Sequence, residues 1–111
     1  MRHFRWDALD ETNLPSVSGS VRRRFVSGQN LTIARISFAP GTELPAHRHE
    51  NEQVSVVLDG AIEFVVEGET VRVQAGEAIL LAPNELHGAR TSPDQGVVLI
   101  DIFAPHRADW S

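Results

Sequence analysis

The sequence predicts an all-β fold built as one small antiparallel barrel or sandwich. Short alternating apolar runs follow one another from about Leu31 to Phe103, and turns rich in glycine and proline separate them. No long window has helical periodicity. A chain of 111 residues lies within the usual size of one domain, so we expect a single domain over residues 1–111.

The predicted elements follow in order along the chain. Residues 1–30 are expected to form an N-terminal arm and an edge strand in which Val21, Arg23 and Phe25 alternate. Residues 31–104 are expected to form the barrel, and residues 105–111 a C-terminal tail. The Asp59-Gly60 pair between two alternating runs predicts a hairpin, because a type I′ turn needs positive φ at both central residues.

Composition limits the partners and the kind of metal site. The net charge of −5 is spread along the chain, which argues against a nucleic-acid interface, and the Arg22-Arg23-Arg24 run is expected to lie on a solvated strand edge. With no cysteine, a metal must be held by nitrogen and oxygen ligands. No run approaches the ~18 apolar residues of a membrane span, and the first residues lack the apolar core of a secretory signal. We therefore expect a cytoplasmic protein with no membrane partner.

Three of the five histidines fall in two short segments, at His47 and His49 and at His87. Residues i and i+2 of a strand point to the same face, so His47 and His49 can direct two imidazoles at one point. Gln53 keeps that parity, and His87 would arrive from a distant strand. This pattern predicts one metal site. Glu50 and Glu52 have the wrong parity for a fourth ligand, unless a bulge corrects one of them.

The two histidine segments resemble the paired motifs of the cupin superfamily. Gly41, His47, His49 and Gly60 match the first motif, in which Gln53 stands at the position of the family's glutamate. In the second motif Gly76 and His87 match, whereas three positions depart from the pattern: Ala82, Asn84 and Thr91. The resemblance implies a single-domain jelly-roll β-barrel with one divalent metal ion inside it. Nickel, zinc, iron and manganese all accept such ligands.

The final predicted strand places a carboxylate within an apolar run. Asp101 shares its face with Leu99 and Phe103. If that face is internal, Asp101 is a candidate general acid or base, and the metal or Arg107 would balance its charge; if it is external, Asp101 is a solvated edge residue. We favour the internal position.

The Asp-x-Phe-x-x-x-Arg ending and the glutamine in the first motif resemble a narrower group, the small cupins that convert 4,5-unsaturated monouronates to linear ketonised sugars in pectin and alginate degradation. The resemblance implies that His47, His49 and His87 hold the metal. It also implies that four further residues line the reaction site: Gln53, Asp101, Phe103 and Arg107. Asp101 could move the proton and Arg107 could grip the substrate carboxylate.

Two other kinds of function use similar sites. One is a different metal enzyme, either a dioxygenase acting on flavonols or diketones or a cyclase, and the other is a non-catalytic sugar-binding cupin. For the leading function we expect a carboxylated sugar as the small-molecule substrate. We also expect a homodimer, since the strand at residues 21–26 could cover an open edge of a second copy. Arg35 either reaches the pocket as a second carboxylate holder or forms an outward salt bridge.

Overall fold

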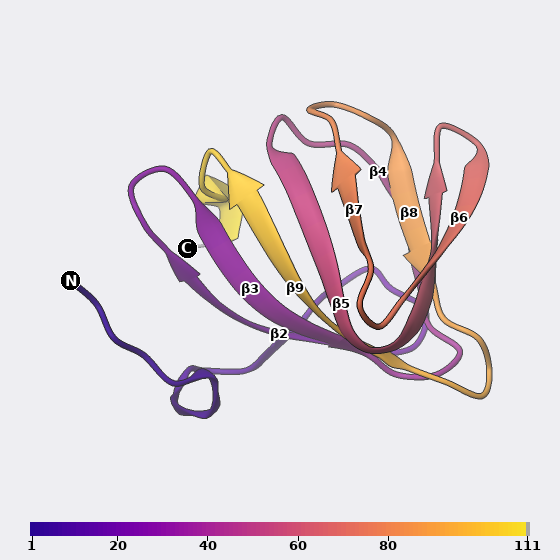
Figure 1. Cartoon of the computed structure of the whole chain (residues 1–111), viewed down its shortest axis with the longest axis horizontal. Helices are drawn as coiled ribbons and strands as arrows, with labels where there is room; N and C mark the ends of the chain where they lie inside the picture. The colour runs from indigo at the N-terminus through magenta and orange to yellow at the C-terminus, as the bar shows by residue number, and fades with distance from the viewer. Residues whose placement is uncertain (111) are drawn as a thin grey trace.

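The computed structural model describes residues 1–110, and over these residues it is a curled antiparallel sheet with two short 3₁₀ turns (Figure 1). The all-β prediction is confirmed. The elements in chain order are η1 Trp6–Ala8, β1 Thr12–Asn13, β2 Val21–Ser27, β3 Thr32–Phe38, β4 Glu43–His47, β5 Glu52–Val66, β6 Glu69–Gln74, β7 Ala78–Leu81, β8 His87–Arg90, β9 Val97–Ala104 and η2 Ala108–Trp110.

The strands form two walls that face each other across a cup (Figure 1). The first wall contains β1, β2, β3, β9, the first half of β5 and β7. The second wall contains β4, β8, the second half of β5 and β6. The long strand β5 therefore belongs to both walls.

The hairpin predicted at Asp59-Gly60 is wrong. β5 runs without a turn from Glu52 to Val66, and its pairing with β9 shifts register between Val57 and Asp59. Gly60 has a φ of +78°, and a Cβ built there would lie 2.1 Å from the carbonyl oxygen of Gly96. The Asp-Gly pair thus marks a bulge where the backbones of β5 and β9 approach closely, and pairing with a distant strand overrides the local turn signal.

Apolar side chains fill the floor of the cup. Val57, Ile62 and Leu99 are each 1% exposed, and Phe64 from the second wall packs in the same cluster. On β9 burial alternates strictly, with Val97, Leu99, Asp101 and Phe103 buried and the residues between them only half-buried. Alternate residues of this strand therefore face into the cup, with apolar side chains at its floor and the carboxylate of Asp101 higher up.

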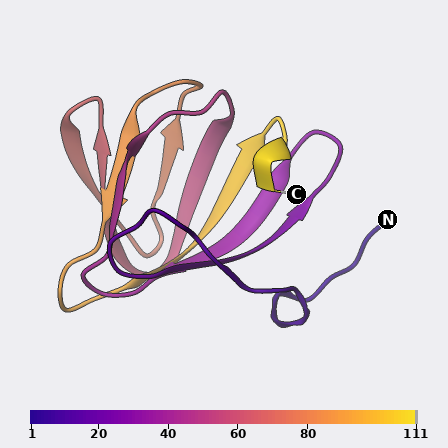
Figure 2. The same ribbon diagram turned by 180° about the vertical axis from the view of Figure 1, so that it is seen from behind.

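The chain before β2 runs across the gap between the two walls (Figure 2). Leu14, Pro15 and Ser16 of this arm form part of the cavity wall. Arg24 fixes the arm, because its Nη1 donates to the carbonyl oxygens of Trp6 at 3.1 Å and Leu9 at 3.3 Å. Within residues 1–110, no helix has the length and apolar character needed to cross a membrane.

Candidate metal centre and active site

Three histidines meet at the rim of the cup. His47 ends β4 and lies opposite His87, the first residue of β8. The two strands are close here, since a Cβ built on Gly88 would lie 2.8 Å from the carbonyl oxygen of Leu44. His49 follows β4 in a loop. Its backbone carbonyl oxygen accepts a 2.8 Å hydrogen bond from the backbone N–H of Asn84. Asn84 has a φ of +64°, a conformation that asparagine tolerates better than most residues.

The histidine rings are oriented as metal ligands. Each Nδ1 is hydrogen-bonded to a backbone carbonyl oxygen: His47 to Pro45 at 3.0 Å, His49 to Asn51 at 3.0 Å and His87 to Glu85 at 2.8 Å. These bonds place the ring proton on Nδ1, so Nε2 of His47 and Nε2 of His87 each keep a lone pair, whereas Nε2 of His49 faces Oε1 of Gln53 at 3.1 Å. Potential ligand atoms of the three rings lie within 4.8 Å of one another, so this group could bind a metal.

The protonation state of the rings also suits a metal. Burial lowers the pKa of His87 to about 4. The pKa of His49 is lowered as well, first by burial and then by the positive charge of Arg107. Both rings are neutral near pH 7, and a histidine must be neutral to bind a metal.

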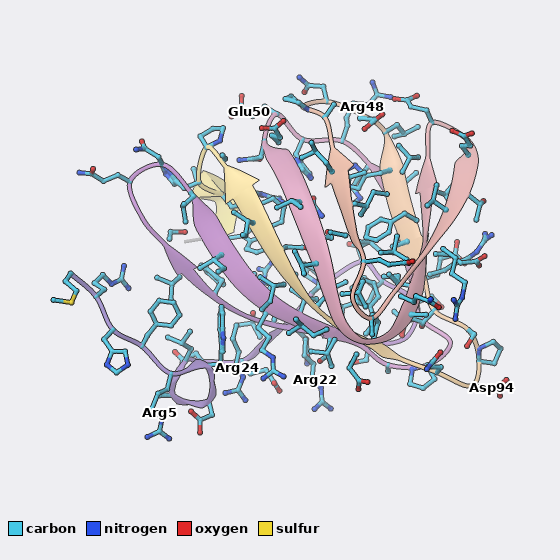
Figure 3. The ribbon with its side chains drawn as sticks, in the orientation of Figure 1. Arg5, Arg22, Arg24, Arg48, Glu50 and Asp94 are labelled. Carbon is cyan, nitrogen blue, oxygen red and sulfur yellow. The ribbon has the colours of Figure 1, made fainter. Side chains whose placement is uncertain are left out.

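Gln53 lies beside the histidine group and could supply a fourth donor atom. Its side chain is buried, and its Oε1 lies 3.1 Å from Nε2 of His49. Two ligand atoms at right angles on one ion, each about 2.1 Å from it, lie roughly 3 Å apart. The glutamine oxygen therefore fits as a fourth donor. Glu50 and Glu52 are exposed and do not join the group, and Glu50 points away from the cup at the rim (Figure 3).

Asp101 faces the cavity, which is the position that we favoured, and a hydrogen-bonded chain connects it to His49. Gln53 donates from Nε2 to Oγ of Ser55 at 3.0 Å, and the Ser55 hydroxyl donates to the Asp101 carboxylate. Burial raises the pKa of Asp101 to about 7, although Ser55 and the charge of Arg107 act in the opposite direction. A carboxyl group with this pKa can both accept and release a proton near neutral pH.

The end of β9 and the segment that follows it cover one side of the site. Phe103 is 2% exposed and packs against His49, with ring centroids 5.7 Å apart. The Arg107 guanidinium lies 4.8 Å from the Phe103 ring, and its Nε and Nη2 donate to both oxygens of Asp109 at 3.0 and 2.9 Å. Asn51 donates to the carbonyl oxygen of Pro105 at 2.6 Å, which fixes this segment to the His49 loop.

Two further residues at the site, Arg23 and Trp110, were missed by the sequence prediction. The Arg23 guanidinium lies 4.1 Å from the Trp110 ring, and Arg107 lies 4.6 Å from the same ring. The Trp110 ring packs on Phe103 with centroids 5.0 Å apart. Burial and the neighbouring charge of Arg107 both lower the pKa of Arg23. The cavity therefore contains two guanidinium groups beside one half-buried indole.

The prediction that the whole arginine run lies on a solvated edge is wrong for Arg23. Arg22 and Arg24 point away from the cup (Figure 3) and pair with Glu11 at 3.8 and 3.3 Å. Arg23 between them points inward, with the same parity as the buried Val21. Arg35 is exposed and does not line the cavity, so the second guanidinium of the site comes from β2 and not from β3.

These residues line one cavity of about 430 Å³. This volume lies in the usual range of small-molecule sites. Its rim is polar, with His47, His87, Gln53, Asp101 and the two arginines, and its floor is apolar, with Ile36, Phe64 and Leu99 among the lining residues.

Comparison with known proteins agrees with this fold and site. The pectin degradation protein KdgF of Dickeya dadantii (strain 3937) is 34% identical over 103 residues, which are 91% of this chain and 93% of that protein. The structure of KdgF from Halomonas sp. matches with a TM-score of 0.85 at 29% identity, over 99% of this chain and 100% of that one. An RmlC-like cupin from Shewanella frigidimarina NCIMB 400 matches with a TM-score of 0.86 at 29% identity, over 100% of this chain and 97% of that one.

The family model of the cupin domain matches residues 34–103, which include all three histidines, Gln53, Asp101 and Phe103. The motif resemblance seen in the sequence is thereby confirmed. The chain belongs to the cupin domain family, and over most of its length it is similar to the KdgF proteins.

Proposed function

We propose that this protein opens the ring of 4,5-unsaturated monouronates from pectin or alginate and yields linear ketonised sugars. One observation carries the proposal: histidines that could hold a metal, a buried carboxyl group and two guanidinium groups lie at the same small cavity. The similarity to a pectin degradation protein over most of the chain supports it.

The reaction is an isomerisation that needs a proton transfer group. The anomeric hydroxyl loses its proton, the bond between carbon 1 and the ring oxygen breaks, and its electron pair stays on that oxygen as an enolate. The proton is then delivered to carbon 4, which leaves a ketone at carbon 5 and an aldehyde at carbon 1. We assign both proton transfers to Asp101, whose pKa of about 7 suits each direction.

The two guanidinium groups are proposed to bind the substrate carboxylate. The Nε and Nη2 edge of Arg107 is already bound to Asp109. Arg23 donates from Nε to Oγ1 of Thr12 at 3.3 Å, and among the described residues its terminal nitrogens form no ion pair. Arg23 therefore offers a free two-nitrogen edge, which matches the geometry of a carboxylate. Phe103 and Trp110 would form the apolar wall beside the sugar ring.

The metal is proposed to be one divalent ion held by His47, His49, His87 and the amide oxygen of Gln53. Such an ion stabilises negative charge that develops on substrate oxygens, and a neutral glutamine in place of glutamate leaves its full charge for this purpose. The chain's own residues then orient the sugar, bind its carboxylate and carry the proton.

The test is turnover of unsaturated galacturonate by the purified protein, with and without added metal. We expect the absorbance of the double bond to disappear and one-dimensional NMR to show the linear product. Parallel assays separate the other functions, since oxygen uptake with flavonols or diketones would indicate a dioxygenase. Saturable binding of the uronate with no loss of absorbance would indicate a binding protein. Either result would overturn the proposal.

A cytoplasmic homodimer also stays a proposal. β1 pairs with β2 at Arg22 and Arg23, and the backbone N–H of Leu14 donates to the carbonyl oxygen of Val21, so the edge from Arg24 to Val26 is the part proposed to pair with a second copy. Light scattering at micromolar concentration should give twice the mass of the chain, and a monomer would contradict the dimer.

A further inference from the structure

Ser55 is a buried polar residue for which neither the motifs nor the proposed reaction provides a role. It is 0% exposed, and it lies on β5 directly opposite Asp101 of β9. Its hydroxyl contacts Gln53 on one side and Asp101 on the other. A buried hydroxyl with two polar partners fixes the direction of the hydrogen bonds on both sides.

The direction of these bonds follows from the number of protons. The Ser55 hydroxyl donates its single proton to the Asp101 carboxylate. The Ser55 oxygen must then accept from the other side, and only the NH₂ group of Gln53 can donate there. The amide oxygen of Gln53 is consequently turned toward His49, at 3.1 Å from its Nε2.

A glutamine needs this orientation, whereas a glutamate does not. The two ends of a carboxamide differ, and the NH₂ end cannot bind a metal. The two oxygens of a carboxylate are equivalent, so a glutamate presents an oxygen in either rotation. Because this chain has Gln53 at the motif's glutamate position, it requires a neighbour that distinguishes oxygen from nitrogen.

We infer that Ser55 is a positioning residue that orients the Gln53 amide, with its oxygen toward the histidines, by linking it to the Asp101 carboxylate. The inference rests on the proposed metal site. It also explains how the amide is held in the absence of the glutamate: two hydrogen bonds link the NH₂ group of Gln53 through Ser55 to the Asp101 carboxylate.

The decisive experiment measures zinc affinity by competition with a chelator in four proteins: wild type, Ser55→Ala, Gln53→Glu and the double variant. In the glutamine background we expect Ser55→Ala to weaken zinc binding about tenfold, within the range of residues that orient metal ligands. In the glutamate background the same change should not weaken binding, because a carboxylate needs no orientation. A loss of packing alone would weaken both backgrounds equally, and that result would overturn the inference.

A second measurement uses the metal-free protein and needs no activity. In a ¹H–¹⁵N spectrum the side-chain amide protons of Gln53 should exchange slowly with solvent, because the amide is buried and donates to Ser55. Ser55→Ala should speed that exchange at least tenfold while leaving the backbone amides of β9 protected. Unchanged Gln53 exchange, or unchanged zinc affinity in Ser55→Ala, would refute the role of Ser55 alone. A wild-type protein that binds no divalent ion would refute the metal site and the inference together.

Discussion

The two walls of the cup contribute different chemistry. The second wall supplies His47 and His87, from β4 and β8. The first wall supplies Gln53, Ser55, Asp101 and Phe103 from β5 and β9, together with Arg23 from β2. The second wall thus carries two of the proposed metal ligands, and the first wall carries the groups proposed to bind the substrate and move its proton. His49 lies in the loop between β4 and β5, which connects the two walls.

This division means that metal binding and substrate chemistry can be separated by substitution. Only Gln53 belongs to both sets, and the Ser55 hydroxyl connects it to Asp101. A substitution in the second wall should remove the metal and the activity together, whereas a substitution in the first wall at a residue other than Gln53 or Ser55 should leave metal binding unchanged.

The largest effect is expected from His87→Ala. Loss of one imidazole should weaken zinc binding more than the 10–100-fold typical of groups that merely orient a ligand. Uronate turnover should fall by more than about a thousandfold, because several kcal/mol of charge stabilisation are lost. Metal content by mass spectrometry and double-bond absorbance measure the two losses. Full activity in a metal-free variant would end the proposed role of the second wall.

The next largest effect is expected from Asp101→Asn. An asparagine cannot carry the proton, so kcat should fall by roughly 10²–10⁴, as is typical of a lost general acid or base. Zinc affinity should change by less than about tenfold, since Asp101 is not among the proposed ligands. Steady-state kinetics and chelator competition on the same sample give both values. If kcat stayed within about threefold of wild type, Asp101 would not be the proton carrier.

A smaller effect is expected from Arg23→Ala. Losing a charged hydrogen-bonding partner of the substrate should raise KM about tenfold or more, the equivalent of roughly 1.5–3 kcal/mol, with little change in kcat. Arg22→Ala is the matched control, because Arg22 is the adjacent residue on the same strand and points out of the cup (Figure 3). Equal effects of the two substitutions on KM would show that net charge, and not the position of Arg23, matters.

The smallest effect concerns the pH dependence of folding in the metal-free protein. The pKa of Asp101 is raised from 3.8 to about 7 in the folded state, so between these values the folded protein holds a proton that the unfolded chain has lost. The contribution of Asp101 to stability is therefore full below pH 4 and is lost as the pH rises toward 7, with a slope of at most about 1.4 kcal/mol per pH unit.

Denaturant titrations of wild type and Asp101→Asn at a series of pH values test this point. The lowered pKa of His87 acts in the opposite direction in wild type, so the difference between the two proteins isolates Asp101. The free energy of unfolding of wild type should decline relative to the variant from pH 4 to pH 7. A constant difference would show that Asp101 does not hold a proton in the folded state.

The sequence predicted those parts of the site that depend on local spacing. The parity of His47, His49 and Gln53 placed these side chains on one face, and alternation in the last strand placed Asp101 on the same face as Phe103. These are properties of a few adjacent residues on an extended chain, so no knowledge of pairing was needed. The roles of these residues stay predictions until the substitutions are made.

The features that sequence reasoning missed depend on distant partners or on signals that were read too coarsely. Asp59-Gly60 has the local chemistry of a turn, but pairing with β9 decided its geometry. Arg23 was interpreted together with its charged neighbours as part of a solvated edge. Its parity with Val21 indicated that its side chain faces the cavity. Ser55 lies two residues from Gln53 and could have been found by the same parity. Trp110 had no local signal, since its position depends on how the segment after β9 folds back.

The continuity of β5 has a consequence for how the protein folds and unfolds. This one strand pairs with β6, β7, β8 and β9, so each wall contains half of it. Neither wall has a complete sheet without β5, and its partners lie up to residue 104 in the sequence. We therefore expect both walls to melt in a single cooperative transition, with no state in which the metal ligands stay assembled after the substrate wall has unfolded.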